Sequence, residues 1–484
     1  MRRLKTIMLL ALLGLMSACT NELDERIDYV GENTPTSPQS PYHISLSQAL
    51  DNLKATSSAL GLETTRSLER GNWTVQRIPL SHFNSKTRTN ETTEDSDAVY
   101  VVNFDNAEGY AILSADNRLP DDVIAVTNSG TYNFTPGPVT DFENPLTLED
   151  LYVEEDDDYL LGSVEQNDII DNLLINYVNG WTDSLRGDFE TGETPIIPPT
   201  EPINYSFTYQ TTREIPEMLT YNWGQHSPFN DRCPKRYKYS GLFGILMSSI
   251  EEYDFDGEAE WGDDFLGVEE LYAGCVAIAV SQILAYHNFP DTDDIEPGED
   301  CITDWRTLRT NNLGTESHVI LKTDISRLVH TIGVGCDMIY GFWGSQFSFA
   351  TPVGARDYLR ELGYTNVERT LGYDLSIIVE SLENDCPIFI GAVSGDVDGH
   401  AWVIDGYKEV DCIKTGTNSD GIIVVSPYVV STTKYVHCNW GWHGSHNGWF
   451  ASNLHEQSFI TDEDTEYDHL YRLVTYDKPN TGTE

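Results

Sequence analysis

One segment of the chain, residues 273–290, has the spacing of a buried helix. Its apolar residues recur at intervals of three and four positions, which is the period of one face of an α-helix. The residues that share this period are Val276, Ala279, Val280, Ile283 and Leu284. Gly274 precedes the predicted helix and Pro290 closes it, because proline has no amide hydrogen with which to continue. The first turn of this helix therefore carries Cys275.

Two shorter segments near the amino-terminal end predict strands. Residues 98–104 and 109–114 are rich in β-branched and aromatic residues, and a polar turn separates them. A helical pattern with Ser45 as its candidate cap comes before them. Residues from 41 to about 139 therefore predict a small module of mixed α and β structure.

The rest of the chain divides at a proline-rich segment. Residues 192–202 contain four prolines, a composition that favours an extended and accessible chain. A helical pattern from about 164 to 185 precedes it, and the acidic stretch 149–158 is interpreted as a solvated loop or helix start rather than an ion site. We expect an amino-terminal block over residues 41–190, a linker over 191–205 and a second block over 206–476.

Composition narrows the possible partners. The chain has 484 residues, with 29 lysines and arginines against 78 aspartates and glutamates, which gives a formal net charge of −49 at pH 7. A surface this negative repels phosphates and anionic lipid head groups, so it excludes nucleic-acid binding and a polybasic membrane contact. Hydrophobic residues still make up 39% of the chain, which is enough to build sizeable cores. The acidity is therefore a property of the surface.

The amino terminus has the pattern of an export signal. Basic residues at positions 2, 3 and 5 precede a short apolar run, Ile7–Leu15, and small residues then lead to Cys19. The run is too short to span a bilayer as a stable helix, and small residues before a cysteine are typical of bacterial lipoproteins. We expect a signal peptide over 1–18, acylation of Cys19 and an exposed tether over 19–40. The predicted location is the outer membrane or cell surface, with or without later release; the alternative is an ordinary signal peptide with an incidental cysteine.

The eight cysteines give no sign of a metal or redox motif. Once Cys19 is set aside, seven remain, so at least one is free or bonded to another molecule. No pair has C-x-x-C spacing, which argues against zinc and thioredoxin-like sites. Disulfides among the others stay open, because sequence alone does not assign their pairing. We expect neither a metal nor a cofactor.

The position of Cys275 favours a nucleophile. At the first turn of a helix, unpaired amide groups and the helix dipole lower the pKa of a thiol and favour the thiolate. From this segment alone, the alternative is a buried and inert cysteine. A thiolate nucleophile also needs a base, and a third group must hold that base in place.

His400 is the best candidate for the base. It follows a loop that contains glycines and aspartates and precedes the apolar run 401–407, so it stands at the start of a predicted strand, where it can face a cleft. His287 is closer to Cys275 in the sequence. It lies twelve residues further along the same predicted helix, about 18 Å away at 1.5 Å per residue, which is too far for a base.

The segment 435–450 supplies the third group. It contains Asn439 followed by Trp440. An asparagine can accept a hydrogen bond from one imidazole nitrogen, and a neighbouring tryptophan can shield that bond from water. The alternative is a tryptophan-rich hairpin built for packing. His437 and His443 in the same segment are interpreted as incidental.

These three segments resemble the streptopain family of papain-like cysteine peptidases. The residues that carry the resemblance are Gly274–Ala277 with Gln282 and Tyr286–Asn288, then Gly399–Tyr407, then Asn439–Trp442. A fourth run, Asn222–Gln225 with Pro228–Asn230, is similar to the family's segment upstream of the nucleophile. The resemblance covers the chain from about residue 41 to 472, and it implies that Gln225 is the side-chain donor of an oxyanion hole.

The resemblance also implies the fold and the order of domains. The second block would be a papain-like peptidase domain within an α+β fold, in which a nucleophile helix packs against an antiparallel β subdomain. The strands at 98–114, with Ser114–Pro120, look like the family's inhibitory propeptide, so residues 41–190 would block the cleft until cut. The chain departs from the family at 237–270, which is longer and acidic, and the role of this insertion stays open.

The implied reaction is hydrolysis of peptide bonds by a thiolate–imidazolium pair of Cys275 and His400. Asn439 would orient His400, and Trp440 would cover their contact. The amide of Cys275 and the side chain of Gln225 would stabilise the oxyanion. The implied partners are protein or peptide substrates, the chain's own propeptide and, through the lipid anchor, a membrane. The alternative is a catalytically silent papain-like surface protein that binds other proteins or inhibits proteases.

Overall fold

A computed structural model describes most of the chain between residues 42 and 479. The segments within this range that lie outside the description are 63–67, 69–70, 72, 84–95, 136–151, 154–157, 160, 163–165, 185–203, 240–264, 296–302, 311–312, 314–318, 342–345, 394–398, 457–458, 461–465 and 468–470. The predicted signal peptide, the tether with Cys19 and nearly all of the predicted linker therefore lie outside the described residues. So does most of the acidic insertion. None of the helices in the described ranges is both long and apolar enough to cross a membrane.

The main element of the described fold is a sheet of eleven strands. The strands lie in the order β1, β2, β3, β4, β17, β16, β15, β14, β20 and β13, and β8 pairs with β15 beside this row. Their bounds are β1 (Trp73–Pro79), β2 (Asp97–Phe104), β3 (Tyr110–Ser114), β4 (Val123–Thr127), β8 (Asn204–Ile215), β13 (Thr365–Leu371), β14 (Ile388–Val393), β15 (Gly399–Thr417), β16 (Ile423–Asn439), β17 (Gly448–Ala451) and β20 (Arg472–Asp477). Neighbouring strands are antiparallel, which agrees with the predicted α+β class; the division into two papain-like subdomains stays a prediction.

The predicted hairpin near the amino-terminal end is confirmed. β2 and β3 pair antiparallel, and their bounds lie within a residue or two of the predicted strands. Helix α2 (Leu46–Leu60) begins after Ser45, whose hydroxyl oxygen accepts a hydrogen bond from the Gln48 amide at 3.2 Å. The predicted cap is therefore also present.

The sheet continues across the predicted domain boundary. β4 of the amino-terminal block pairs with β17, so that Val126 lies opposite Trp449 and Ala125 opposite Phe450. Gly448 makes this approach possible, because a Cβ atom there would lie 2.4 Å from the carbonyl oxygen of Val126. The two blocks, which the sequence predicts as separate units, share one hydrogen-bonded sheet.

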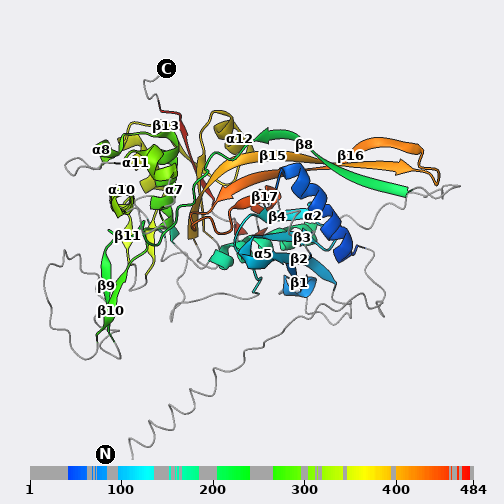
Figure 1. The fold of residues 1–484 in the computed structure, drawn as a ribbon, viewed down its shortest axis with the longest axis horizontal. Helices are drawn as coiled ribbons and strands as arrows, with labels where there is room; N and C mark the ends of the chain where they lie inside the picture. The colour runs from blue at the N-terminus through cyan, green and yellow to red at the C-terminus, as the bar shows by residue number, and fades with distance from the viewer. Residues whose placement is uncertain are drawn as a thin grey trace, which may run out of the picture. The chain divides into compact units, whose positions relative to one another are not determined.

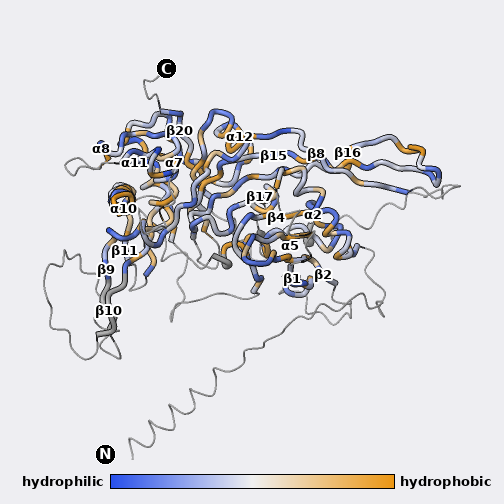
Figure 2. Tube along the Cα trace, viewed as in Figure 1, coloured by the Kyte–Doolittle hydropathy of each residue, from blue (hydrophilic) through white to orange (hydrophobic). Residues whose placement is uncertain are grey.

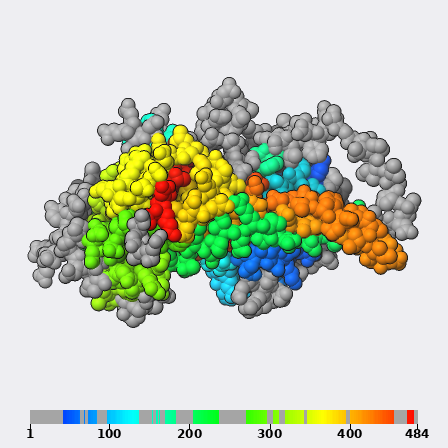
Figure 3. All heavy atoms as spheres, turned by 90° about the horizontal axis from the view of Figure 1, so that it is seen from above, coloured from blue at the N-terminus to red at the C-terminus, as the bar shows by residue number. Residues whose placement is uncertain are grey.

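Two long strands bring the candidate site residues together. β15 and β16 form a hairpin of 19 and 17 residues, and β8 lies along the other edge of β15 (Figures 1 and 3). In Figure 3, β8 is the green band beside the orange hairpin. The start of β15 pairs with the end of β16, where Val403 lies opposite Asn439. His400 and Asn439 are therefore on neighbouring strands at the same end of the hairpin.

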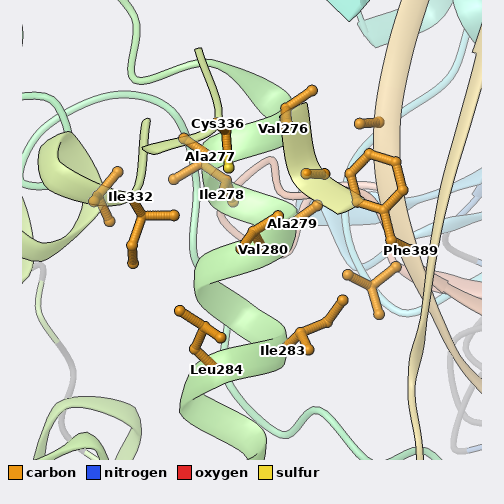
Figure 4. Packing of buried hydrophobic residues seen from close by; sticks show 14 of the residues in the cluster. Val276, Ala277, Ile278, Ala279, Val280, Ile283, Leu284, Ile332, Cys336 and Phe389 are labelled. Carbon is orange, nitrogen blue, oxygen red and sulfur yellow. The ribbon is translucent and has the colours of Figure 1, made fainter. Parts of the chain in front are cut away.

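Helix α7 (Cys275–His287) is the buried helix that the sequence predicts. Every residue in it except Tyr286 is buried. Figure 4 shows it between Ile332 and Cys336, at the end of α10 (Val319–Gly335), and Phe389 of β14. Hydrophobic residues of α10 and of α12 (Leu375–Glu383) are orange in Figure 2. The helix is thus fixed on one side by other helices and on the other by the sheet.

The remaining helices and strands complete the described fold. They are α5 (Gln166–Ser184), α8 (Thr292–Ile295), α9 (Trp305–Thr310), α11 (Pro352–Glu361), α13 (Asn453–Glu456), β5 (Tyr152–Val153), β6 (Asp158–Tyr159), β7 (Leu161–Gly162), β9 (Lys235–Tyr239), β10 (Phe265–Glu270), β11 (Ile339–Tyr340), β12 (Ser348–Ala350), β18 (Phe459–Ile460) and β19 (Glu466–Tyr467). β7 pairs with β12, and β9 pairs with β10 at the two ends of the acidic insertion.

Leu284 of α7 tests the placement of this helix in the core. Leu284 is 0% exposed, whereas Leu371 at the end of β13 is 64% exposed. Leu284→Ala should lower the free energy of unfolding by about 2–5 kcal/mol, because it removes buried methyl groups and leaves a cavity. The matched control Leu371→Ala should change it by less than about 0.5 kcal/mol. Denaturant titrations of both variants measure this, and equal effects would contradict the placement.

Candidate active site

Cys275 is the first residue of α7, as the sequence predicts. Gly274 before it has a φ of 90°, in the left-handed region. A Cβ atom on Gly274 would also lie 2.0 Å from Cε of Met338. The turn into the helix therefore requires glycine, and this requirement fixes the direction in which the cysteine enters the core.

Burial dominates the chemistry of the Cys275 thiol. The residue is 2% exposed, and loss of solvent raises the pKa of the thiol to about 12. Backbone amides of Ala401, Val276 and Cys275 itself donate toward the sulfur and lower the pKa, but by less. The amides at the helix start lower the pKa as predicted, but desolvation outweighs them, so the net pKa is raised in the full chain. Cys275 is a neutral thiol here.

His400 is the second residue of β15 and stands at the start of a strand, as predicted. Its Nε2 forms a hydrogen bond of 2.9 Å with the carbonyl oxygen of Trp440, and its Nδ1 has no hydrogen-bond partner among the described residues. Burial lowers the pKa of His400 to about 4, so the ring is neutral. Because a carbonyl oxygen only accepts, Nε2 carries the hydrogen and Nδ1 is left as a buried, unprotonated acceptor.

Cys275 and His400 are neighbours that share no hydrogen bond. The amide of Ala401, the residue after His400, donates to the Cys275 sulfur, so the nucleophile lies beside the start of β15. The hydrogen bonds of the described structure join neither ring nitrogen of His400 to that sulfur. The predicted thiolate–imidazolium pair is absent from the full chain, because burial penalises both charges.

Asn439 is held by Gln282 rather than by His400. Its Oδ1 accepts a hydrogen bond from Nε2 of Gln282 at 2.9 Å, and its Nδ2 donates to the carbonyl of Tyr221 at 3.3 Å. The hydrogen bond predicted between Asn439 and His400 is therefore not formed within the described part of the chain. Gln282 lies seven residues after Cys275, which puts both on one face of α7. This spacing is the signal that could have identified Gln282 as a site residue.

Trp442 supplies the aromatic ring nearest to His400. Its ring stacks on the imidazole with centroids 4.7 Å apart, whereas the ring of Trp440 is 6.2 Å away. The two indole rings stack on each other at 5.3 Å. The covering role predicted for Trp440 therefore falls mainly to Trp442, which the prediction missed although it stands two residues later in the same motif. Trp440 contributes its carbonyl oxygen instead.

Gln225 lies beside the nucleophile segment. Its carbonyl oxygen accepts a hydrogen bond of 3.0 Å from the amide of Ala273, two residues before Cys275. An isolated bridge joins Gly224 to Trp442, so the same segment also reaches the end of β16. The structure thus brings all four predicted segments to one place; the oxyanion role of Gln225 stays a prediction.

The described part of the chain offers no cluster of three or more side chains suited to a metal ion. Every cysteine in the described ranges is a buried free thiol. The disulfides that the sequence left open are therefore not formed among these residues.

Comparison with known proteins points to peptidases. Residues 223–450, which hold the four segments of the site except Asn222, match the Peptidase C10 family. This match and the similar proteins support a cysteine-type peptidase. Streptopain from Streptococcus pyogenes is 23% identical over 379 residues, which cover 73% of each chain. A Porphyromonas gingivalis protein named thiol protease/hemagglutinin PrtT is 23% identical over 299 residues, which cover 56% of this chain and 29% of that one.

Part of the amino-terminal block lies over the candidate site. β7 contacts α7, β14 and β15 as well as its partner β12. Leu161 of β7 packs on Gly391 of β14, where a Cβ atom would lie 2.3 Å from Cδ1 of Leu161. Gly391 pairs with Ala401, so Leu161 lies one strand away from the amide that binds the sulfur. Leu161, Cys275 and His400 are all buried, at 1%, 2% and 1% exposure.

Asp158 contradicts the interpretation of the acidic stretch 149–158 as simply solvated. Asp158 is 1% exposed, and its carboxylate accepts hydrogen bonds from Nε of Arg472 at 3.0 Å and from Nη1 of Arg369. A carboxylate between two guanidinium groups can be buried, whereas an unpaired one would be costly. The burial of Asp158 is not predictable from the sequence, because its arginine partners belong to β13 and β20, more than 200 residues away along the chain.

The neutral, buried His400 predicts a loss of stability in acid. Its pKa is about 4 in the folded chain and about 6.5 in the unfolded chain. The unfolded state therefore binds a proton first as the pH falls, and the free energy of unfolding should be unaffected above about pH 6.5 and decrease toward pH 4. The decrease from this one group should be roughly 3 kcal/mol.

Urea titrations across this pH range in a Cys275→Ala background measure the effect. The matched chain Cys275→Ala/His400→Gln should show a smaller decrease, since it lacks the titrating ring. An identical pH dependence in the two chains would contradict the burial of a neutral His400.

Proposed function

We propose that this chain is an exported cysteine endopeptidase made as a zymogen, with Cys275 as nucleophile and His400 as general base. The observation that supports it most is the meeting of α7 with β15, where the amide after His400 reaches the Cys275 sulfur. The match to the Peptidase C10 family supports the same chemistry. Export and a lipid anchor on Cys19 are supported by the amino-terminal sequence alone.

The proton path follows from the hydrogen bonds of His400. The Trp440 carbonyl on Nε2 selects the tautomer in which Nδ1 can accept the thiol proton. The sulfur then forms a bond to the peptide carbonyl carbon, and the carbonyl oxygen becomes an oxyanion that the Cys275 amide and Gln225 bind. The imidazolium protonates the leaving nitrogen as the C–N bond breaks. A water molecule, deprotonated by the same imidazole, finally hydrolyses the thioester.

Asn439 acts in this proposal as a positioning residue. Its hydrogen bond to Gln282 ties the end of β16 to α7. Trp440 follows Asn439 in the chain, so this tie fixes the carbonyl that holds His400. Loss of Asn439 should therefore disturb the orientation of the base without removing any group that reacts.

Latency in the full chain follows from burial. β7, which carries Leu161, contacts α7 and β15 where a substrate would have to bind, and the buried ion pairs of Asp158 fasten the preceding residues. A cut in the predicted linker would let this segment leave. Water would then reach the site and stabilise the charged forms of Cys275 and His400, which raises the fraction of thiolate.

The alternative is a catalytically silent papain-like protein. The lack of a hydrogen bond between Cys275 and His400 in the described structure is the observation that favours it. This alternative predicts that the two residues stay apart after the amino-terminal block is gone.

Processing and cleavage separate the two functions. The wild-type chain should lose its amino-terminal block and cleave casein under reducing conditions, and Cys275→Ala should do neither. Gln225→Ala should cleave about 10²–10³-fold more slowly, because it lacks one oxyanion donor. Mass spectrometry of the products from the three chains reports these rates and the cleavage positions. Wild type that processes no faster than Cys275→Ala and leaves casein intact would contradict the proposal.

Asp158 tests the origin of latency. Asp158→Asn keeps the size of the side chain but removes the charge that pairs with Arg369 and Arg472, so β7 should leave the cleft more often. We expect processing about 10-fold faster or more. Asp97→Asn is the matched control, because Asp97 pairs with the exposed Arg77 at 3.1 Å in the same block and not with the peptidase block. If both variants process at the wild-type rate on a gel time course, the anchoring role of Asp158 is wrong.

A further inference from the structure

Two arginines of the peptidase block surround one carboxylate from the amino-terminal block. Nε of Arg472 is 3.0 Å from Oδ1 of Asp158, and Arg369 pairs with Oδ2. The side chains of Arg369 and Arg472 are only 15% and 9% exposed. They lie on the paired strands β13 and β20. The carboxylate is therefore held by two cations from a rigid part of the sheet, in a site largely closed to water.

This arginine pair lies close to the candidate nucleophile. Arg472 pairs with Gly391, and Gly391 pairs with Ala401, whose amide reaches the Cys275 sulfur. Two strand spacings of about 4.8 Å place the backbone of Arg472 about 10 Å from that of Ala401. A peptide that crosses the strands near the sulfur can therefore reach the arginine pair within a few residues.

The amino-terminal block itself shows such a path. Leu161 packs on Gly391 beside the nucleophile, and Asp158, three residues earlier, is bound by the arginines. Three residues of chain span at most about 10 Å, which is enough to reach from Gly391 to the arginine pair one strand away. Asp158 and Leu161 thus mark two positions of one peptide that lies over the site.

Departure of Asp158 would leave the two guanidinium groups without this shared anion. Arginine stays charged at any physiological pH, and two guanidinium groups that converge on one carboxylate repel each other unless an anion lies between them. Guanidinium groups bind carboxylates with directed, charge-assisted hydrogen bonds. The processed enzyme would therefore hold a strong carboxylate site, although the chain as a whole has a net charge of −49.

We propose that Arg369 and Arg472 form a carboxylate-binding subsite that selects substrates with an aspartate or glutamate three residues from the apolar residue that takes the place of Leu161. In the full chain Asp158 fills this subsite. The proposal rests on the proposed peptidase function, because it needs a substrate peptide that crosses the same cleft.

Matched peptides test the selection. Each peptide is blocked at both ends, so that a side chain is its only carboxylate, and contains one leucine with Asp or Asn three residues before or after it. In one of these two pairs, kcat/KM of the processed enzyme should be about 10–100-fold higher for Asp than for Asn. Peptides with the Asp moved by one residue should show a ratio near one. Ratios near one in both pairs would overturn the proposal.

Arginine variants test whether the preference for Asp over Asn peptides comes from Arg369 and Arg472. In Arg369→Gln and Arg472→Gln, the ratio of Asp to Asn peptide should fall toward one. Arg356→Gln is the control, because Arg356 of α11 pairs with Asp357 at 2.8 Å instead; it should keep the wild-type ratio. Each ratio is measured within one variant, so a change in overall activity cancels. A preference that persists in both site variants would overturn the assignment.

An assay without catalysis tests the carboxylate site by itself. In the full chain with Cys275→Ala and Asp158→Ala, sodium acetate should raise the melting temperature above that in sodium chloride of equal ionic strength. Cys275→Ala alone should show no such difference, because Asp158 fills the site. Equal melting temperatures in the two salts for the double variant would overturn the site. Failure to cleave any peptide, with acetate still stabilising, would instead count against the proposed peptidase function and leave the carboxylate site supported.

Discussion

The packing of the first turn of α7 against the first residues of β15 determines the rest of the site. One amide, that of Ala401, joins the two elements at the Cys275 sulfur. Gly274 allows the tight entry into the helix, and the bond between Gln282 and Asn439 ties the same helix to β16. The core around α7 therefore does more than stabilise the fold, because it holds β15, β16 and α7 in the arrangement that brings Cys275 beside His400.

Desolvation keeps the two candidate reactive groups in their neutral forms in the full chain. Burial raises the pKa of Cys275 to about 12 and lowers that of His400 to about 4, so each is in its neutral form at neutral pH. The amino-terminal block adds to the fold in two ways. It extends the sheet through the pairing of β4 with β17, and it places Leu161 over the site. The proposed latency thus needs no distorted residue, only a strand that excludes water.

The sequence predicted the features that depend on residues close together in the chain. The apolar period of α7, its cysteine at the first turn and His400 at the start of a strand are all present, because each depends on residues close together in the chain. Long-range partners were not predictable in this way. Asn439 binds Gln282 and not His400, and the indole nearest to the imidazole is Trp442. Such choices depend on which side chains the tertiary packing leaves within reach.

The acidic residues show the same limit. Counting charges predicted a solvated, acidic surface, yet Asp158 is buried between arginines of two distant strands. The sequence gives the charge of Asp158, but the arginines that pair with it are brought there by the pairing of β13 with β20.

The central claim is that burial under the amino-terminal block, and not the absence of catalytic groups, keeps Cys275 neutral. The most direct test is the rate at which iodoacetamide alkylates Cys275 as a function of pH, followed by mass spectrometry of the peptide that contains it. The account predicts almost no alkylation of the full chain at neutral pH, and rapid alkylation of the processed chain that persists below pH 7. Equal rates in the two chains, or a processed chain that reacts only at alkaline pH, would contradict it.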